Sequence, residues 1–209
     1  MTRFDTKMVF LLSVLVMVNF YTNAQNRPKD RSAHYPTFSW ETVPVAFHFG
    51  KRSALMTPEE ARFVASKSNF ICLEKGHAYK QFDYTEEGIE QEAQQLKKYN
   101  PDMKVIFYWN TFLDYPLFEA HREYELNPEW WLRIQDGSLD LKNGRIKRYD
   151  LSNPEVRAWW TEVARKAVVD GSTDGVFMDA FPQIKSAKNR KLWGDKKYEA
   201  IQEGLRKII

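Results

Sequence analysis

The stretch Asp174-Gly175-Val176-Phe177-Met178-Asp179 decides the fold, because it has the form of a buried β-strand with a carboxylate directly at its end. Three similar runs precede it in the chain, at residues 43–49, 70–74 and 104–110. All four are nearly continuously apolar, which is typical of strands that are buried on both faces in a parallel sheet.

Helical segments are predicted between these strands. Thr57-Pro58-Glu59-Glu60 has the form of a capping box with proline in the first turn, and it predicts a helix to about residue 67. Further helices are predicted from Thr85, from Asn153 and over residues 196–209. The alternation of strand and helix predicts parallel βαβ units and an α/β fold.

Polar and aromatic side chains collect where each predicted strand ends. They are His48, Glu74, Tyr108, Trp109, Asn110 and Asp179. In a (β/α)8 TIM barrel the carboxyl ends of the strands form the active-site face, so this pattern predicts a site built from four strand ends. Structural roles remain as alternatives: Asp179 as a turn cap, Glu74 as the salt-bridge partner of Lys75, and His48 as a core histidine.

One connection is unusually long, with roughly 60 residues between the third and fourth strands where a few are common. Asp136-Gly137 and Asn143-Gly144 within it are turn signals of the hairpin type. Trp130 and its neighbour Trp131 could form a platform for a sugar ring, or could anchor the connection by burial.

Composition narrows the possible partners. The chain has 7 Trp, 10 Tyr and 14 Phe, and such aromatic rings suit either carbohydrate stacking or a protein core. Its net charge of +3 comes without a basic block, so we expect no nucleic-acid partner. Cys72 is the one cysteine, which excludes an internal disulfide. No phosphate-binding loop and no zinc-ligand spacing is present, so neither cofactor nor metal is predicted.

The N-terminus has the form of a cleavable signal peptide. Arg3 and Lys7 precede an apolar stretch at residues 8–20, and Ala24 offers a small residue for cleavage. The sequence therefore predicts a signal peptide over residues 1–24, a flexible leader over 25–37 and a domain over 38–209. A secreted or periplasmic protein without membrane attachment after cleavage is expected, and an uncleaved anchor is the alternative.

Several motifs carry a resemblance to a known family. Asn127-Pro128-Glu129-Trp130, the run from Asp150 to Arg157 and the stretch from Asp174 to Asp179 resemble hypothetical glycosyl hydrolase family 15, as do residues 38–44 and 73–76. The resemblance implies a (β/α)8 barrel distantly similar to α-amylases, in which Asp179 matches the nucleophile. His48, Tyr108, Trp109 and Asn110 would line the sugar subsite beside it.

The predicted function is that of a glycoside hydrolase acting on oligo- or polysaccharides with two carboxylates, Asp179 serving as nucleophile or transition-state stabiliser. About four βα units are visible, which predicts the N-terminal half of a barrel. The general acid is therefore expected beyond Ile209, and these residues alone are expected to be inactive. A non-catalytic carbohydrate-binding barrel is the alternative, and a metal-dependent barrel hydrolase would need more ligands than His48 and Glu74 supply.

Overall fold

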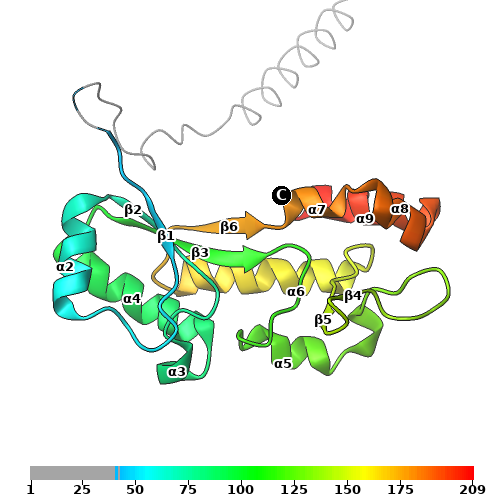
Figure 1. Ribbon diagram of the computed structural model, residues 1–209, viewed down its shortest axis with the longest axis horizontal. Coiled ribbons are helices and arrows are strands. Elements are labelled where there is room, and N and C mark those ends of the chain that lie inside the picture. The colour runs from blue at the N-terminus through cyan, green and yellow to red at the C-terminus, as the bar shows by residue number, and fades with distance from the viewer. Residues whose placement is uncertain (1–40, 42) are drawn as a thin grey trace, which may run out of the picture. The chain divides into compact units, whose positions relative to one another are not determined.

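The computed structural model describes residue 41 and residues 43–209. In this part of the chain, four strands form one parallel sheet in the order β1-β2-β3-β6 (Figure 1). The strands are β1 (Phe47–Phe49), β2 (Phe70–Leu73), β3 (Lys104–Asn110) and β6 (Gly175–Asp179). The fold is thus a mixed α/β structure with a parallel sheet. The predicted signal peptide and leader lie outside the described residues.

The sequence predicted the third and fourth strands with their full bounds. The first strand is shorter than predicted, because residues 43–46 stay outside the sheet and expose Val43 and Val45 to solvent. The second strand ends at Leu73, one residue before Glu74.

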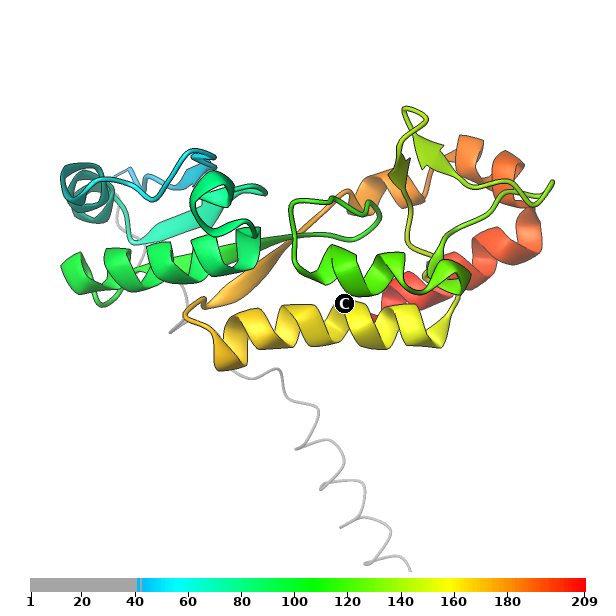
Figure 2. The same ribbon diagram turned by 90° about the horizontal axis from the view of Figure 1, so that it is seen from below.

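Three helices lie on one face of the sheet, as Figures 1 and 2 show. They are α2 (Pro58–Lys67), α4 (Thr85–Tyr99) and α6 (Pro154–Arg165), and each connects two neighbouring strands of the sheet. The short helix α3 (Tyr79–Phe82) precedes α4, and α6 runs on into a π-helical turn over Lys166–Asp170. This arrangement confirms the predicted order of strands and helices.

Two of the predicted helix starts are confirmed by their caps. Thr57 accepts a hydrogen bond from the backbone N–H of Glu60, while the Glu60 carboxylate accepts from the N–H of Thr57, which is a complete capping box. The side chain of Asn153 caps α6 by accepting from the N–H of Glu155. Each such cap stabilises the helix by about 1 kcal/mol.

The main core lies between the sheet and these helices. Phe107 and Trp109 of β3 are fully buried, and the Trp109 ring packs against Trp159 and Trp160 of α6. Burial of a large apolar side chain is worth about 1.5–3 kcal/mol. The helix-facing side of the sheet therefore supplies most of the packing.

The other face of the sheet is only partly covered. The register aligns His48 with Cys72 and then with Ile106, and it aligns Tyr108 with Phe177. Because side chains alternate along a strand, these residues share the face opposite Phe107. Phe177 is 40% exposed and His48 is also exposed. The expectation of strands buried on both faces is therefore wrong for β1 and β6, which form the edges of the described sheet.

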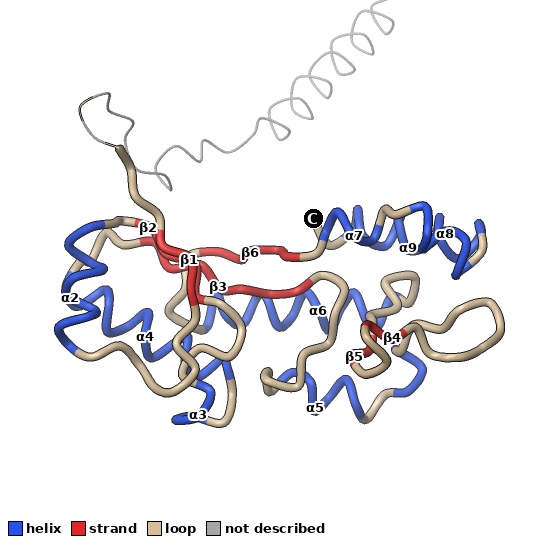
Figure 3. The backbone as a smooth tube through the Cα atoms, viewed as in Figure 1, coloured by secondary structure: helices blue, strands red, loops and turns tan. Residues whose placement is uncertain are grey.

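The long connection between β3 and β6 folds into small elements (Figure 3). It contains α5 (Ala120–Glu125), a 3₁₀ turn at Pro128–Trp130, and the antiparallel hairpin β4 (Leu141–Lys142) and β5 (Ile146–Lys147). Asn143 and Gly144 both have positive φ, 55° and 68°, at the tip of this hairpin. The predicted hairpin turn is confirmed, because such turns require positive φ at both central positions.

After β6 the chain forms three helices, α7 (Phe181–Ile184), α8 (Ala187–Trp193) and α9 (Asp195–Lys207). Helix α9 packs against α6, and a Cβ atom at Gly204 would lie only 1.8 Å from the Leu151 carbonyl oxygen. Glycine is thus needed for this close approach. Among the described residues, no helix is both long and apolar enough to span a bilayer.

Candidate active site

Polar side chains meet at the carboxyl edge of the sheet. Asp179 ends β6, and its Cα pairs with that of Asn110, which ends β3. Tyr108 lies two residues before Asn110, so both side chains point to the same face as Asp179. Tyr108 and Asn110 are buried and Asp179 is half-buried. The structure therefore brings these three predicted site residues together.

One oxygen of the Asp179 carboxylate is held by two donors. The Tyr108 hydroxyl donates to Oδ2 at 2.5 Å, and Asn110 Nδ2 donates to the same oxygen at 3.3 Å. Oδ1 accepts no hydrogen bond from any other described residue. A carboxylate fixed through one oxygen, with the other oxygen free, is well placed to meet a reacting carbon.

The pKa of the Tyr108 phenol lies well above its usual value. Burial is the largest cause, and the hydrogen bond to Asp179 is the second. Tyr108 therefore stays protonated at neutral pH and can only be the donor in this pair. Asn110 is oriented from its other end, because its Oδ1 accepts the backbone N–H groups of Phe112 at 2.9 Å and Leu113 at 2.7 Å. Its amide N–H₂ must then face Tyr108 and Asp179.

The backbone of Asp179 is anchored by a residue that the sequence analysis did not identify. The buried Thr111 bonds the Asp179 carbonyl oxygen twice, through its hydroxyl at 2.6 Å and its backbone N–H at 2.9 Å. Ala180 follows in the left-handed region with φ 66°, which turns the chain away from the strand. Thr111 thus fixes the direction in which the Asp179 side chain leaves the sheet.

Glu74 forms a second polar group beside β1 and β2. His48 Nε2 lies 3.0 Å from Glu74 Oε1, and Lys75 Nζ lies 2.5 Å from Oε2. Gly50 makes room for this arrangement, because a Cβ atom there would lie 3.1 Å from the Glu74 Cβ. The ion pair with Lys75, which the sequence left as an alternative for Glu74, is present.

Lys75 links the Glu74 group to the Asp179 group. Its Nζ lies 4.4 Å from the centroid of the Tyr108 ring and 5.7 Å from that of Tyr115. Both distances are within the range of a cation–π interaction. Burial, together with the charges of Asp179 and Glu74, raises the pKa of Tyr115. Tyr115 therefore belongs to the same electrostatic neighbourhood.

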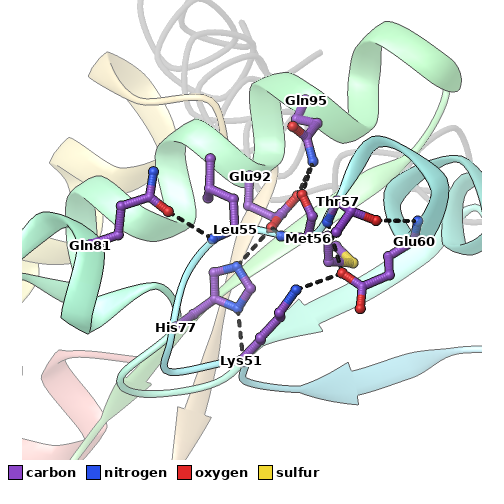
Figure 4. Close-up of polar contacts among 9 residues, drawn as sticks. All are labelled: Lys51, Leu55, Met56, Thr57, Glu60, His77, Gln81, Glu92 and Gln95. Atoms are coloured by element: carbon purple, nitrogen blue, oxygen red, sulfur yellow. Dashed lines mark hydrogen bonds and ion pairs between the residues drawn. The ribbon is translucent and has the colours of Figure 1, made fainter.

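A buried polar network holds the loop that follows β1 (Figure 4). His77 Nε2 lies 3.0 Å from Glu92 Oε2, and its Nδ1 accepts the Lys51 backbone N–H at 3.2 Å. Glu92 also accepts the Met56 N–H at 2.7 Å. Because Nδ1 is an acceptor, Nε2 carries the proton and donates to Glu92. This network fixes the loop next to His48.

Two predicted substrate contacts lie elsewhere. Trp109 is 1% exposed, points to the helix side of the sheet, and donates from Nε1 to the Trp160 carbonyl oxygen at 3.3 Å. Trp130 is buried as well, and its Nε1 donates to Glu155 at 3.1 Å. The assignments of Trp109 and Trp130 to a sugar site are therefore wrong, because both rings form part of the core. Trp130 instead anchors the long connection by burial, which was the alternative to a sugar platform.

Three site residues were not identified as such from the sequence, namely Lys75, Thr111 and Tyr115. From the sequence, Lys75 is expected only as a salt-bridge partner that would make Glu74 structural. Thr111 directly follows Asn110, so its place after a strand end was a usable signal. Tyr115 lies in a loop without periodicity, and no sequence pattern places it near Asp179.

The described sheet is parallel, carries helices on one face and holds a fixed carboxylate at its carboxyl edge. The chain belongs to hypothetical glycosyl hydrolase family 15, whose model matches residues 97–209. The matched segment includes Tyr108, Asn110 and Asp179, whereas His48 and Glu74 precede it.

Several solved structures are similar to this chain at low sequence identity. A hypothetical protein from Ruminiclostridium thermocellum is 16% identical over 78% of this chain and 90% of its own, with a TM-score of 0.51. A variant of the GH36 α-galactosidase AgaA from Geobacillus stearothermophilus is 13% identical over 79% of this chain and 25% of its own, with a TM-score of 0.51. The glycoside hydrolase domain of PelA from Pseudomonas aeruginosa is 15% identical over 79% of this chain and 54% of its own, with a TM-score of 0.47.

The chain thus spans 54% of the PelA domain and 25% of the α-galactosidase. These neighbours include glycoside hydrolases with TIM-barrel folds, and at these identities the likeness concerns the fold alone. No curated protein matches the sequence significantly.

Proposed function

We propose that the protein is a glycoside hydrolase of oligo- or polysaccharides, with Asp179 as nucleophile or transition-state stabiliser. The parallel sheet would be a segment of a (β/α)8 barrel, whose carboxyl edge is the active face. The observation that carries the proposal is the Asp179 carboxylate, which is held at Oδ2 by Tyr108 and Asn110 and whose Oδ1 bonds no other residue of the described part of the chain.

In the retaining form of this reaction, Asp179 Oδ1 forms a bond to the anomeric carbon while the bond from that carbon to the leaving oxygen breaks. A carboxylic acid gives its proton to the leaving oxygen, and water then hydrolyses the glycosyl-enzyme ester. Tyr108 and Asn110 would orient the carboxylate, and Thr111 would hold its backbone, so that little reorganisation is needed during attack.

Glu74 suits substrate binding better than proton donation. Both of its oxygens are engaged, one by His48 and the other by Lys75, so neither is free to protonate a leaving oxygen. We therefore assign the general acid to a residue other than Glu74. The accessible His48 and Glu74 would contact the sugar, with Lys75 and Tyr115 beside them. Tyr108 and Asn110 are buried, so they would act on the sugar through the Asp179 carboxylate that they hold.

The same observation favours a second function, a carbohydrate-binding protein without catalysis. If no carboxylic acid meets the leaving oxygen, the site would bind sugars through Asp179, His48 and Glu74 and would leave the glycosidic bond intact. Hydrolysis by the wild-type protein distinguishes the two functions.

The test is the release of reducing ends from a panel of polysaccharides by the full-length protein. Asp179→Asn should lower turnover by several orders of magnitude and leave sugar binding nearly intact, because it removes a transition-state interaction. Asp174→Asn is the matched control, since Asp174 lies at the other end of β6 and pairs there with Lys97 at 2.8 Å. Equal rates for wild type and Asp179→Asn on a verified substrate would refute the assignment.

We also propose that the protein is exported and that residues 1–24 are removed. N-terminal sequencing of exported material should then begin at Gln25, because Ala24 offers a small residue before the cleavage point. Recovery of an uncleaved chain in the membrane fraction would instead support an anchor.

A further inference from the structure

Three side chains that could bind a metal ion meet beside the long connection. They are Asp114, His121 and Glu125 (the Asp114 cluster), and one ligand atom of each residue lies within 4.8 Å of those of the other two. Asp114 Oδ2 is 2.7 Å from His121 Nδ1, which is 3.9 Å from Glu125 Oε1. None of these residues belongs to the Asp179 group.

The local fold holds the three ligands in place. His121 and Glu125 are four residues apart on α5, so their side chains lie on one face of the helix. Asp114 is only 4% exposed, and its backbone N–H donates to the Lys147 carbonyl oxygen of β5 at 3.0 Å. The sequence does not predict this combination, because the cluster contains no pair of histidine or cysteine at zinc-ligand spacing.

The donor set and its dimensions suit a transition metal. One imidazole with two carboxylates is a ligand set that Zn²⁺ accepts, at about 2.0–2.2 Å from each ligand atom. Tetrahedral geometry at that radius places ligand atoms about 3.3 Å apart. The two separations around His121 each differ from this value by about 0.6 Å, and the third is within 4.8 Å, so side-chain shifts would bring the ligand atoms to this spacing. The proton that now bonds His121 Nδ1 to Asp114 would leave when the ion binds.

The Lys147 ammonium group already bonds Glu125, one of the three ligands. Its Nζ is hydrogen-bonded to Glu125 Oε1, and it also lies 3.8 Å from the centroid of the Trp131 ring. The Trp131 face gives Lys147 a second favourable partner. Lys147 can therefore release Glu125 and remain in place, and it would compete with a metal ion for that carboxylate.

We propose that Asp114, His121 and Glu125 form a binding site for a divalent transition-metal ion such as Zn²⁺, with the remaining coordination positions filled by water. The ion would connect α5 to the segment that follows β3. That segment includes Phe112 and Leu113, whose N–H groups orient Asn110. A bound ion would thus stabilise the segment that orients Asn110, and through Asn110 the Asp179 carboxylate.

The experiment is a calorimetric titration of Zn²⁺ into the EDTA-treated, dialysed full-length protein. One saturable equivalent is expected, and Asp114→Asn and His121→Gln should each weaken binding at least tenfold. Glu123→Gln is the matched control, because Glu123 lies on α5 outside the cluster, and His48→Gln controls for the pair of His48 with Glu74. Both controls should bind Zn²⁺ as the wild type does.

Lys147→Met gives a test in which Zn²⁺ binding should become stronger, so that a merely damaged protein would not give the expected result. If Lys147 competes for Glu125, this variant should bind Zn²⁺ several-fold more tightly than the wild type. If the three side chains form only ion pairs and no metal site, neither the wild type nor Lys147→Met should bind Zn²⁺ saturably. Absence of binding at 1 mM Zn²⁺, or unchanged binding in a folded Asp114→Asn variant, would overturn the proposal. Circular dichroism establishes that each variant is folded.

Discussion

The imidazole of His48 and the ring of Phe177 pack edge to face, with centroids 4.9 Å apart, although the two residues lie on the outermost strands of the sheet. Neighbouring strands are about 4.8 Å apart, so three spacings would separate these strands by about 14 Å in a flat sheet. The contact therefore requires the sheet to curl toward the face that carries Asp179. Such curvature is what a segment of a barrel needs, and it supports the proposed barrel.

Tyr108→Phe tests the donor to the Asp179 carboxylate. The variant keeps the ring and loses the hydroxyl that lies 2.5 Å from Oδ2. Because a hydrogen bond to a charged group is worth about 1.5–3 kcal/mol, kcat/KM for glycoside hydrolysis should fall about 10- to 100-fold. Tyr124→Phe is a suitable control, since Tyr124 is equally buried and bonds the Arg148 carbonyl oxygen, away from the site. A fall of similar size in both variants would point to loss of stability instead.

Cys72 should be chemically inert in the folded protein. It is 3% exposed, and burial raises the pKa of its thiol to about 12. At pH 8 about one molecule in ten thousand would then carry the thiolate, the form that attacks disulfide reagents. We expect negligible reaction with Ellman's reagent in buffer and one thiol per chain in urea. Rapid reaction without denaturant would show that the face around Cys72 opens in solution.

The parts of the site that could be predicted are those fixed by the strands themselves. An apolar run that ends in a polar residue indicates where a buried strand stops, and this placed Asn110 and Asp179 correctly at one sheet edge. The error over Trp109 was avoidable. Trp109 stands between Tyr108 and Asn110, so the two-residue alternation of a strand already assigns it to the opposite face.

Other parts depend on tertiary contacts that leave no local pattern. Trp130 lies in a connection without strand or helix periodicity, and only its packing against Trp159 shows that it is a core residue. Tyr115 and the Asp114 cluster likewise arise from the way in which the long connection folds back. A single sequence carries no spacing rule for such contacts.

Glu86 should give the protein a pH-dependent stability. Its oxygens accept the backbone N–H groups of Glu119 and Ala120 at 2.9 and 3.1 Å, and burial raises its pKa. The fold therefore favours the protonated form over the charged one. Its contribution to the free energy of unfolding is present below the unfolded pKa of about 4.3 and declines as pH rises through the folded pKa.

Urea unfolding of Glu86→Gln at several pH values from 4 to 7 measures this effect. The stability advantage of the wild type over the variant should be largest at the acidic end and should shrink toward pH 7. Glu87→Gln is the control, because Glu87 is exposed and, among the described residues, bonds only Gln91 on the same helix. An advantage that grows with pH would mean that the folded protein favours the charged form of Glu86 instead.

Thr111 should act as a positioning residue for Asp179. Thr111→Val keeps the shape of the side chain and removes the hydroxyl that bonds the Asp179 carbonyl oxygen, whereas Thr111→Ser keeps the hydroxyl and removes a methyl group. Each change should lower the free energy of unfolding by about 1 kcal/mol, through a lost hydrogen bond in the valine variant and a small cavity in the serine variant.

The effects of the two variants on activity should differ. If the hydroxyl fixes the direction of the Asp179 side chain, kcat should fall about tenfold or more in the valine variant and little in the serine variant, with KM nearly unchanged in both. Equal kcat values in two variants of matched thermal stability would show that Thr111 only stabilises the fold.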